Sequence, residues 1–208
     1  MKNILKLFGA IVLAIGAYYV WHENYNYGFE EISKDKVYKS GLINPDKLDK
    51  YLKKYRIKTV IDLQNPSLQD TLNSDKQENI DKEESAVKKY NQKYNADVVH
   101  INIPSTQIPT KETLNKFFEV LDNSANYPIL MHCYHGVGRA EIYSAIYRIE
   151  YEKWSNSDAR AKTRFIVQGF GYKSSFADGE SKGDFLMNYK PRSAGEEATI
   201  NQLQSLNK

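Results

Sequence analysis

The sequence has little of what several common classes of protein require. It holds one cysteine, Cys133, among 208 residues, so neither an internal disulfide nor a four-cysteine zinc site can form. No glycine-rich nucleotide fingerprint and no H-E-x-x-H motif is present, and we predict neither a metal nor a cofactor. The net charge is only +3, with lysines and acidic residues interleaved, which argues against a nucleic-acid partner. The length suits one medium domain with appendages.

Long apolar runs are also scarce, and the longest lies at the N-terminus. Leu7–Trp21 carries no charge and follows Lys2 and Lys6. A spanning helix needs roughly 17–25 apolar residues, which the run reaches only together with the residues before it. We interpret residues 1–24 as a signal anchor or a cleaved signal peptide, with a buried core helix as the alternative. Because the basic residues precede the run, the domain should lie outside the cytosol, membrane-anchored on the periplasmic side or exported.

Helix and strand patterns alternate along the rest of the chain. Asn44-Pro45 begins one helix, Thr110 caps another, and Ser155 with Asp158 begins a third. A further helix is expected from about Asp81 to Tyr94. Short apolar runs predict strands at residues 58–63, 98–103 and 129–132.

This alternation predicts an α/β domain over residues 25–192, with a central, mainly parallel sheet flanked by helices. Residues 193–208 form a polar tail. The segment 169–185, rich in glycine and serine, is either a flap near the site or an ordinary connection.

The residues that carry chemistry gather around the single cysteine, in MHCYHGVGRA at residues 131–140. Gly136 and Gly138 permit the dihedral angles by which main-chain amides converge on an anion. The helix that follows adds positive potential at its N-terminus, and Arg139 offers a planar fork for phosphate. Such a field favours a thiolate. The loop therefore predicts that Cys133 attacks a bound phosphate and forms a phosphocysteine.

The stretch HCYHGVGRA resembles the His-Cys-x5-Arg signature of cysteine-dependent protein phosphatases, and the order of elements resembles their compact, dual-specificity-like bacterial branch. Looser similarity runs from Val37 to Pro191, through VYKSGL, IKTVIDL, VVHINIP and FLMNYKP. The resemblance implies a protein-tyrosine-phosphatase-like fold and the hydrolysis of phosphorylated proteins or small phosphomonoesters. It also implies Cys133 as nucleophile and Arg139 as phosphate clamp. The implied cradle consists of Tyr134, His135, Gly136, Val137 and Gly138.

Two departures from the family pattern bear on turnover. Ala140 stands where the family usually has serine or threonine, and the stretch Ser105–Thr110 lacks the aspartate that usually serves as acid. Asp62, at the end of its strand, is a possible substitute acid, or a structural hydrogen-bond partner there. His132 is expected to bond loop carbonyls, and His135 to contact either substrate or solvent.

Other functions remain open on the sequence. The chain could be a phosphate-binding module with little turnover, or a phosphatase of inositol or lipid phosphates. A rhodanese-like sulfurtransferase also places a cysteine after a strand, but its loop is typically one residue shorter. Cys133 could finally be a small core residue.

Overall fold

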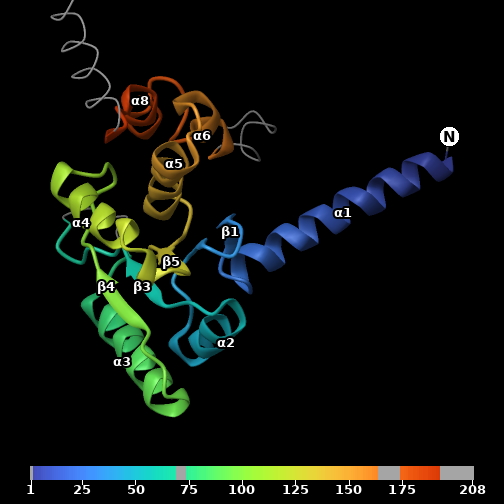
Figure 1. The fold of residues 1–208 in the computed structure, drawn as a ribbon. Coiled ribbons are helices and arrows are strands. Elements are labelled where there is room, and N and C mark those ends of the chain that lie inside the picture. Colours follow the sequence, from blue (N-terminus) through green and yellow to red (C-terminus); the bar gives the residue numbers. More distant parts are fainter. Residues whose placement is uncertain (1, 69–73, 164–173, 193–208) are drawn as a thin grey trace, which may run out of the picture. The chain divides into compact units, whose positions relative to one another are not determined.

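The computed structural model describes residues 2–68, 74–163 and 174–192 (Figure 1). The chain forms two compact units, Met1–Ala140 and Glu141–Lys208. The first contains the sheet and the Cys133 loop. The described part of the second consists of the remainder of one long helix and two shorter helices.

A five-stranded sheet forms the centre of the first unit, in the order β1-β2-β5-β3-β4. Strand β1 pairs antiparallel with β2, and the other three pairings are parallel. The predicted α/β architecture, a sheet flanked by helices, is therefore confirmed. The antiparallel pair lies in residues 30–40, where the sequence patterns predicted no strand. The strands are β1 (Glu30–Ser33), β2 (Val37–Ser40), β3 (Thr59–Asp62), β4 (Val99–Asn102) and β5 (Ile129–His132).

The predicted helix starts are confirmed by side-chain caps. Asn44 Oδ1 accepts a hydrogen bond from the amide of Asp46 at 2.9 Å, and Thr110 Oγ1 accepts one from the amide of Thr113 at 3.2 Å. Helix α3 begins earlier than the sequence pattern predicted. The helices are α1 (Lys2–Asn24), α2 (Pro45–Tyr55), α3 (Gln77–Tyr94), α4 (Lys111–Asp122), the 3-10 turn η1 (Ser124–Asn126), α5 (Arg139–Glu152), α6 (Asn156–Lys162) and α8 (Ser181–Asn188).

The expected hydrophobic anchor at the N-terminus is not supported. Helix α1 does form, and its apolar side chains, such as Leu7 and Leu13, are largely exposed. Within the described residues, however, no helix combines the length and the apolar character that a membrane span requires.

The register of the parallel strands brings the ends of β2, β3 and β5 together. His132, the last residue of β5, lies between Ser40 of β2 and Asp62 of β3. Strands β3 and β5 are buried along their whole length, so this edge is held rigidly. Cys133 follows directly, at the carboxyl edge where parallel α/β sheets bind ligands. Of the segment 169–185, residues 169–173 lie outside the described residues, as does the tail 193–208.

Candidate active site

The Cys133 loop joins the end of β5 to the start of α5. Cys133 is buried, with 2% of its surface exposed. The amide of Gly136 donates to the Cys133 Sγ at 3.3 Å, so the loop curls back over the sulfur. A donor aimed at sulfur stabilises negative charge there, as a thiolate nucleophile requires.

Gly136 is required at its position for two independent reasons. Its φ of +79° lies in the left-handed region, and a Cβ there would sit 2.5 Å from the amide nitrogen of Gly41. The loop therefore packs backbone to backbone against the residues that follow β2. The amide of Leu42, which donates to the carbonyl of Tyr134 at 3.0 Å, fastens the same contact.

Arg139 is buried at the first position of α5, and its guanidinium is anchored by Asp75. Its Nη2 donates to Asp75 Oδ1 at 2.9 Å, its Nη1 donates to Asp75 Oδ2, and Nη1 also donates to the carbonyl of Leu63 at 3.0 Å. The amide of Asn65 in turn holds Asp75 Oδ2 at 2.8 Å. Burial opposes the charge on Arg139, but the Asp75 hydrogen bond and the charge of Cys133 outweigh it and raise its pKa.

Sequence reasoning missed Asp75. It lies in a polar stretch, 64 residues before Arg139, where no spacing or motif marks it. Only the fold brings the two together, in a bidentate pair that fixes the plane of the guanidinium.

The other predicted cradle residues lie at the surface of the loop. Tyr134 and Gly138 are half-buried, while His135 and Val137 are exposed. The rings of Tyr134 and His135 pack edge to face with centroids 4.7 Å apart. The main-chain donor that faces the Cys133 sulfur is the amide of the buried Gly136, between the exposed His135 and Val137.

Asp62 takes the structural role that the sequence left open. Its Oδ1 accepts from the Gln64 amide at 2.8 Å and its Oδ2 from the Gln64 Nε2 at 3.3 Å, and the side chain is fully buried. Burial raises the pKa of this carboxyl, the nearby Glu83 raises it further and His132 lowers it. Both oxygens therefore take part in structural hydrogen bonds at the end of β3.

The loop after β4 supplies no acid in place of Asp62. Residues 104–109 contain no carboxylate. Ser105 is fully buried, and the Thr106 hydroxyl donates to the carbonyl of Ile108. The Ser105 hydroxyl donates to the carbonyl of Thr106, so both hydroxyl groups bond to the loop itself.

His132 bonds a carboxylate rather than the expected loop carbonyls. Its Nε2 lies 2.8 Å from Glu83 Oε2, and His100 Nε2 lies 2.9 Å from the same oxygen. Among the described residues, His132 Nδ1 has no hydrogen-bond partner. Glu83 reaches in from α3, and the sequence pattern predicted it only as part of a helix.

Opposite charges stabilise each other in this buried cluster. Burial alone would raise the pKa of Glu83, yet His132 and His100 lower it to about 2. Burial would likewise lower the pKa of His132, yet Glu83 and Asp62 raise it to about 10. The ligand atoms of Asp62, Glu83 and His132 lie within 4.8 Å of one another, but His132 Nε2 is taken up by its hydrogen bond to Glu83, which leaves no lone pair there for a metal. The hydrogen bonds already satisfy the Glu83 Oε2.

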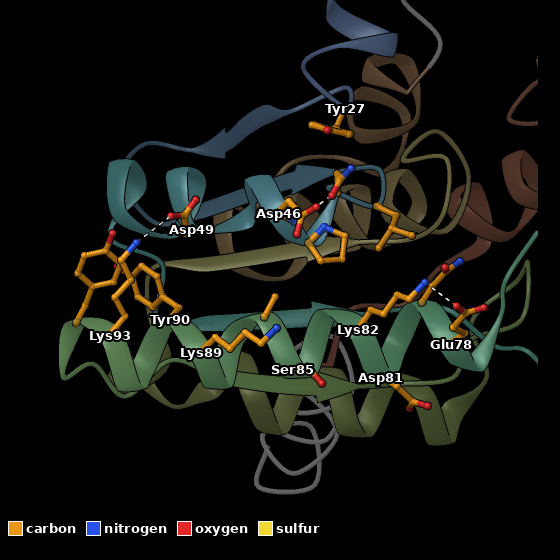
Figure 2. Close-up of a pocket in the computed structure, with 16 residues that line it drawn as sticks. Tyr27, Asp46, Asp49, Glu78, Asp81, Lys82, Ser85, Lys89, Tyr90 and Lys93 are labelled. Carbon is orange, nitrogen blue, oxygen red and sulfur yellow. Dashed lines mark hydrogen bonds and ion pairs between the residues drawn. The ribbon is translucent and has the colours of Figure 1, made fainter.

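A separate groove of about 1140 Å³ lies between α2 and α3 (Figure 2). Its walls carry both signs of charge, for example Asp46 and Asp49 on α2 and Lys82 and Lys89 on α3. None of its lining residues belongs to the Cys133 loop. The groove is thus not the candidate active site.

Comparison with known families gives a match that contains the Cys133 loop. The sequence model of the family described as "DSP-PTPase phosphatase fused to NAD+ Kinase" matches residues 28–177. This range includes the whole sheet and the Cys133 loop. A search of curated proteins gave no significant match.

Several solved structures share the fold. The catalytic domain of the PP-IP phosphatase SIW14 from S. cerevisiae, in complex with citrate, matches with a TM-score of 0.55 and 17% identity, over 84% of this chain and 92% of that one. TpbA of P. aeruginosa matches with a TM-score of 0.55 and 20% identity, over 79% and 86% of the two chains. PTPMT1 in complex with PI(5)P gives a TM-score of 0.52 and 16% identity, over 84% and 98%. At these identities the likeness establishes the fold alone.

Proposed function

Because the chain belongs to this family of DSP-PTPase phosphatases and is a cysteine-dependent phosphatase, we propose that Cys133 is its nucleophile and Arg139 its phosphate clamp. The observation that carries the assignment is the loop itself. A buried cysteine at the carboxyl edge of the sheet receives a main-chain donor on its sulfur, and an anchored guanidinium begins the next helix.

In the first step, the Cys133 thiolate attacks the phosphorus of a bound phosphomonoester. The S–P bond forms as the P–O bond to the leaving group breaks, and the leaving oxygen departs as an anion that takes its proton from solvent water. The loop amides and the Arg139 guanidinium stabilise the charge on the equatorial oxygens. Asp75 serves this step indirectly, because it fixes the plane of the guanidinium.

In the second step, water attacks the phosphocysteine and releases inorganic phosphate and the thiolate. The first turn of α5 offers Ala140, fully buried, where a hydroxyl would assist thiolate departure. This step therefore lacks one source of assistance, and we expect it to be slow.

We propose aryl phosphates, with phosphotyrosine as the protein substrate, as the preferred substrate class. A positioned acid typically contributes about 10²–10⁴-fold in rate, chiefly for strongly basic leaving groups. Residues 104–109 offer no carboxylate, and Asp62 is occupied by Gln64. Phenolate needs the proton less than an alkoxide does. Inositol and lipid phosphates, both alkyl esters, are the competing class.

A second candidate function is capture of phosphate groups with little turnover. Ala140 and the absence of an acid in residues 104–109 favour it. A burst of phenolate equal to the enzyme concentration, with no further turnover, would indicate capture. Continued release after the burst would indicate an enzyme with a slow second step.

The test is hydrolysis of p-nitrophenyl phosphate by the full chain and two variants. Cys133→Ser should abolish release of p-nitrophenol while the fold is kept. Arg139→Lys should be nearly as severe, because lysine keeps the charge but lacks the planar fork. Retention of most activity by Cys133→Ser would refute the thiolate mechanism.

A further inference from the structure

Glu83 is an unusual residue on its helix, because it is a carboxylate with 1% of its surface exposed. The neighbouring Glu84 is solvent-facing and pairs with Lys88 one turn along. An ionised carboxylate in the interior costs several kcal/mol unless a cation and hydrogen bonds compensate it. The cost at Glu83 implies a compensating partner, and neither step of the proposed hydrolysis uses this residue directly.

The geometry around Glu83 identifies that partner. An ionised carboxylate only accepts hydrogen bonds, so His132 and His100 must both direct Nε2–H at its Oε2, at 2.8 and 2.9 Å. His132 is the closer of the two and is as deeply buried as Glu83. A second carboxylate oxygen, Asp62 Oδ1, lies 3.9 Å from the same His132 nitrogen. Two carboxylates facing one imidazole favour its protonated form.

His132 directly precedes Cys133 in the chain, and a negative charge on Cys133 is among the causes that raise the pKa of His132. The interaction is mutual, so a charge on His132 favours the thiolate. The charged groups around it come from every neighbouring element. They are Asp62 at the end of β3, Glu83 on α3, His100 on β4, Cys133 itself and the Arg139 guanidinium, which interacts with both Asp62 and Cys133.

We propose that Glu83 is a positioning residue that keeps His132 as an imidazolium beside Cys133, and that this charge favours the thiolate form. The inference rests on the proposed role of Cys133 as nucleophile. Glu83 touches neither substrate nor sulfur and acts only through His132. The raised pKa of His132, to about 10, agrees with a charge that persists throughout the working range of the enzyme.

The chain allows a direct test, because Cys133 is its one cysteine and any alkylated thiol is Cys133. The rate of alkylation by iodoacetamide is measured from about pH 4 to about pH 9, a range that spans ordinary thiol and imidazole titrations. Glu83→Gln keeps the size of the side chain and removes its charge. Glu84→Gln, one residue along the same helix, is the matched control.

Glu83→Gln should move the alkylation midpoint upward by about one pH unit or more, since a nearby charge shifts a pKa by about 1–3 units. Below the midpoint, alkylation should slow by about tenfold. Glu84→Gln should leave the midpoint in place. An unchanged midpoint in Glu83→Gln would mean that Glu83 is only structural, and a lower one that His132 stays charged without it. Either result overturns the proposal.

A measurement on the unmodified chain covers the case in which Glu83→Gln does not fold. Nitrogen chemical shifts of the four histidine rings should show one imidazolium that persists above about pH 8, well past an ordinary histidine pKa. If all four rings titrate in the ordinary range, the proposal is wrong. Alkylation and ring titration do not depend on phosphate hydrolysis, so they fail or succeed separately from the proposed function.

Discussion

Replacing Gly136 by alanine tests how strictly the loop geometry is imposed. Two costs can be worked out from the structure. A non-glycine residue at φ +79° costs about 1–2 kcal/mol. The added Cβ would also lie 2.5 Å from the nitrogen of Gly41 and 2.8 Å from the carbonyl carbon of Ser40, both backbone atoms that cannot rotate away. Overpacking of this kind costs about 1–3 kcal/mol more.

Two other glycines separate these costs. Gly179 has a similar φ, +74°, but nothing lies within 4 Å of the position that a Cβ would take there, so Gly179→Ala should cost only about 1–2 kcal/mol. Gly41→Ala places its Cβ 3.1 Å from the carbonyl oxygen of Tyr134 and tests crowding of the same contact from the other side. Gly136→Ala should therefore be the most destabilising of the three.

The assays are thermal unfolding and hydrolysis of p-nitrophenyl phosphate. For a chain of this length about 1 kcal/mol lowers the Tm by about 2–4 °C, so Gly136→Ala should lose about 4–20 °C. Activity should fall by about 10²-fold, because the loop must shift away from Gly41 and moves the donor on Cys133 Sγ. If Gly136→Ala matched Gly179→Ala in Tm and kept the activity of the unmodified chain, the loop would not be packed as described.

Further predictions follow from the charges and the missing acid. A series of substituted phenyl phosphates should show kcat/KM falling steeply as the leaving-group pKa rises; a flat dependence would reveal an acid outside Asp62 and residues 104–109. The Glu83 contribution to stability is complete above its ordinary pKa of 4.5 and is lost as the pH falls toward about 2. The His132 contribution is complete below its ordinary pKa of 6.5 and is lost as the pH rises toward about 10. The urea midpoint of unfolding should therefore be highest between about pH 4.5 and 6.5, and its dependence on pH should be weaker in Glu83→Gln. Asp75→Asn leaves the buried Arg139 without its counter-ion and should cost about 3–5 kcal/mol in the same urea assay, and a loss below about 1 kcal/mol would count against a buried pair. Export of the domain stays a prediction. A reporter that works only in the cytosol is fused after Lys208, and activity of that reporter, with no activity of an export-dependent one, would refute export.

The local features of this fold could be read from the sequence because each depends on neighbouring residues. Asn44 and Thr110 each cap a helix by accepting a hydrogen bond from an amide two or three residues further along the chain. The loop after β5 is marked by a cysteine, two glycines and an arginine in close succession. The short strands β1 and β2 were missed, because four residues of mixed polarity give too little periodicity to detect.

The partners that hold the site could not be predicted, because they are distant in the chain. Asp75 and Glu83 reach Arg139 and His132 across 64 and 49 residues. Both come from a charged stretch whose composition is typical of a solvated surface. Which acidic residues of this stretch are turned inward depends on the packing of α3 and on the order of the strands.

The proposed mechanism requires that Cys133 carries the phosphate as a covalent intermediate. The most direct measurement is rapid acid quench of the enzyme during turnover of p-nitrophenyl phosphate, followed by mass analysis of the peptide that contains Cys133. The account predicts a phosphorylated Cys133 that forms as the first p-nitrophenol is released, and neither product in Cys133→Ser. Release of p-nitrophenol by Cys133→Ser at the rate of the unmodified chain, with no phosphate on that peptide, would contradict it.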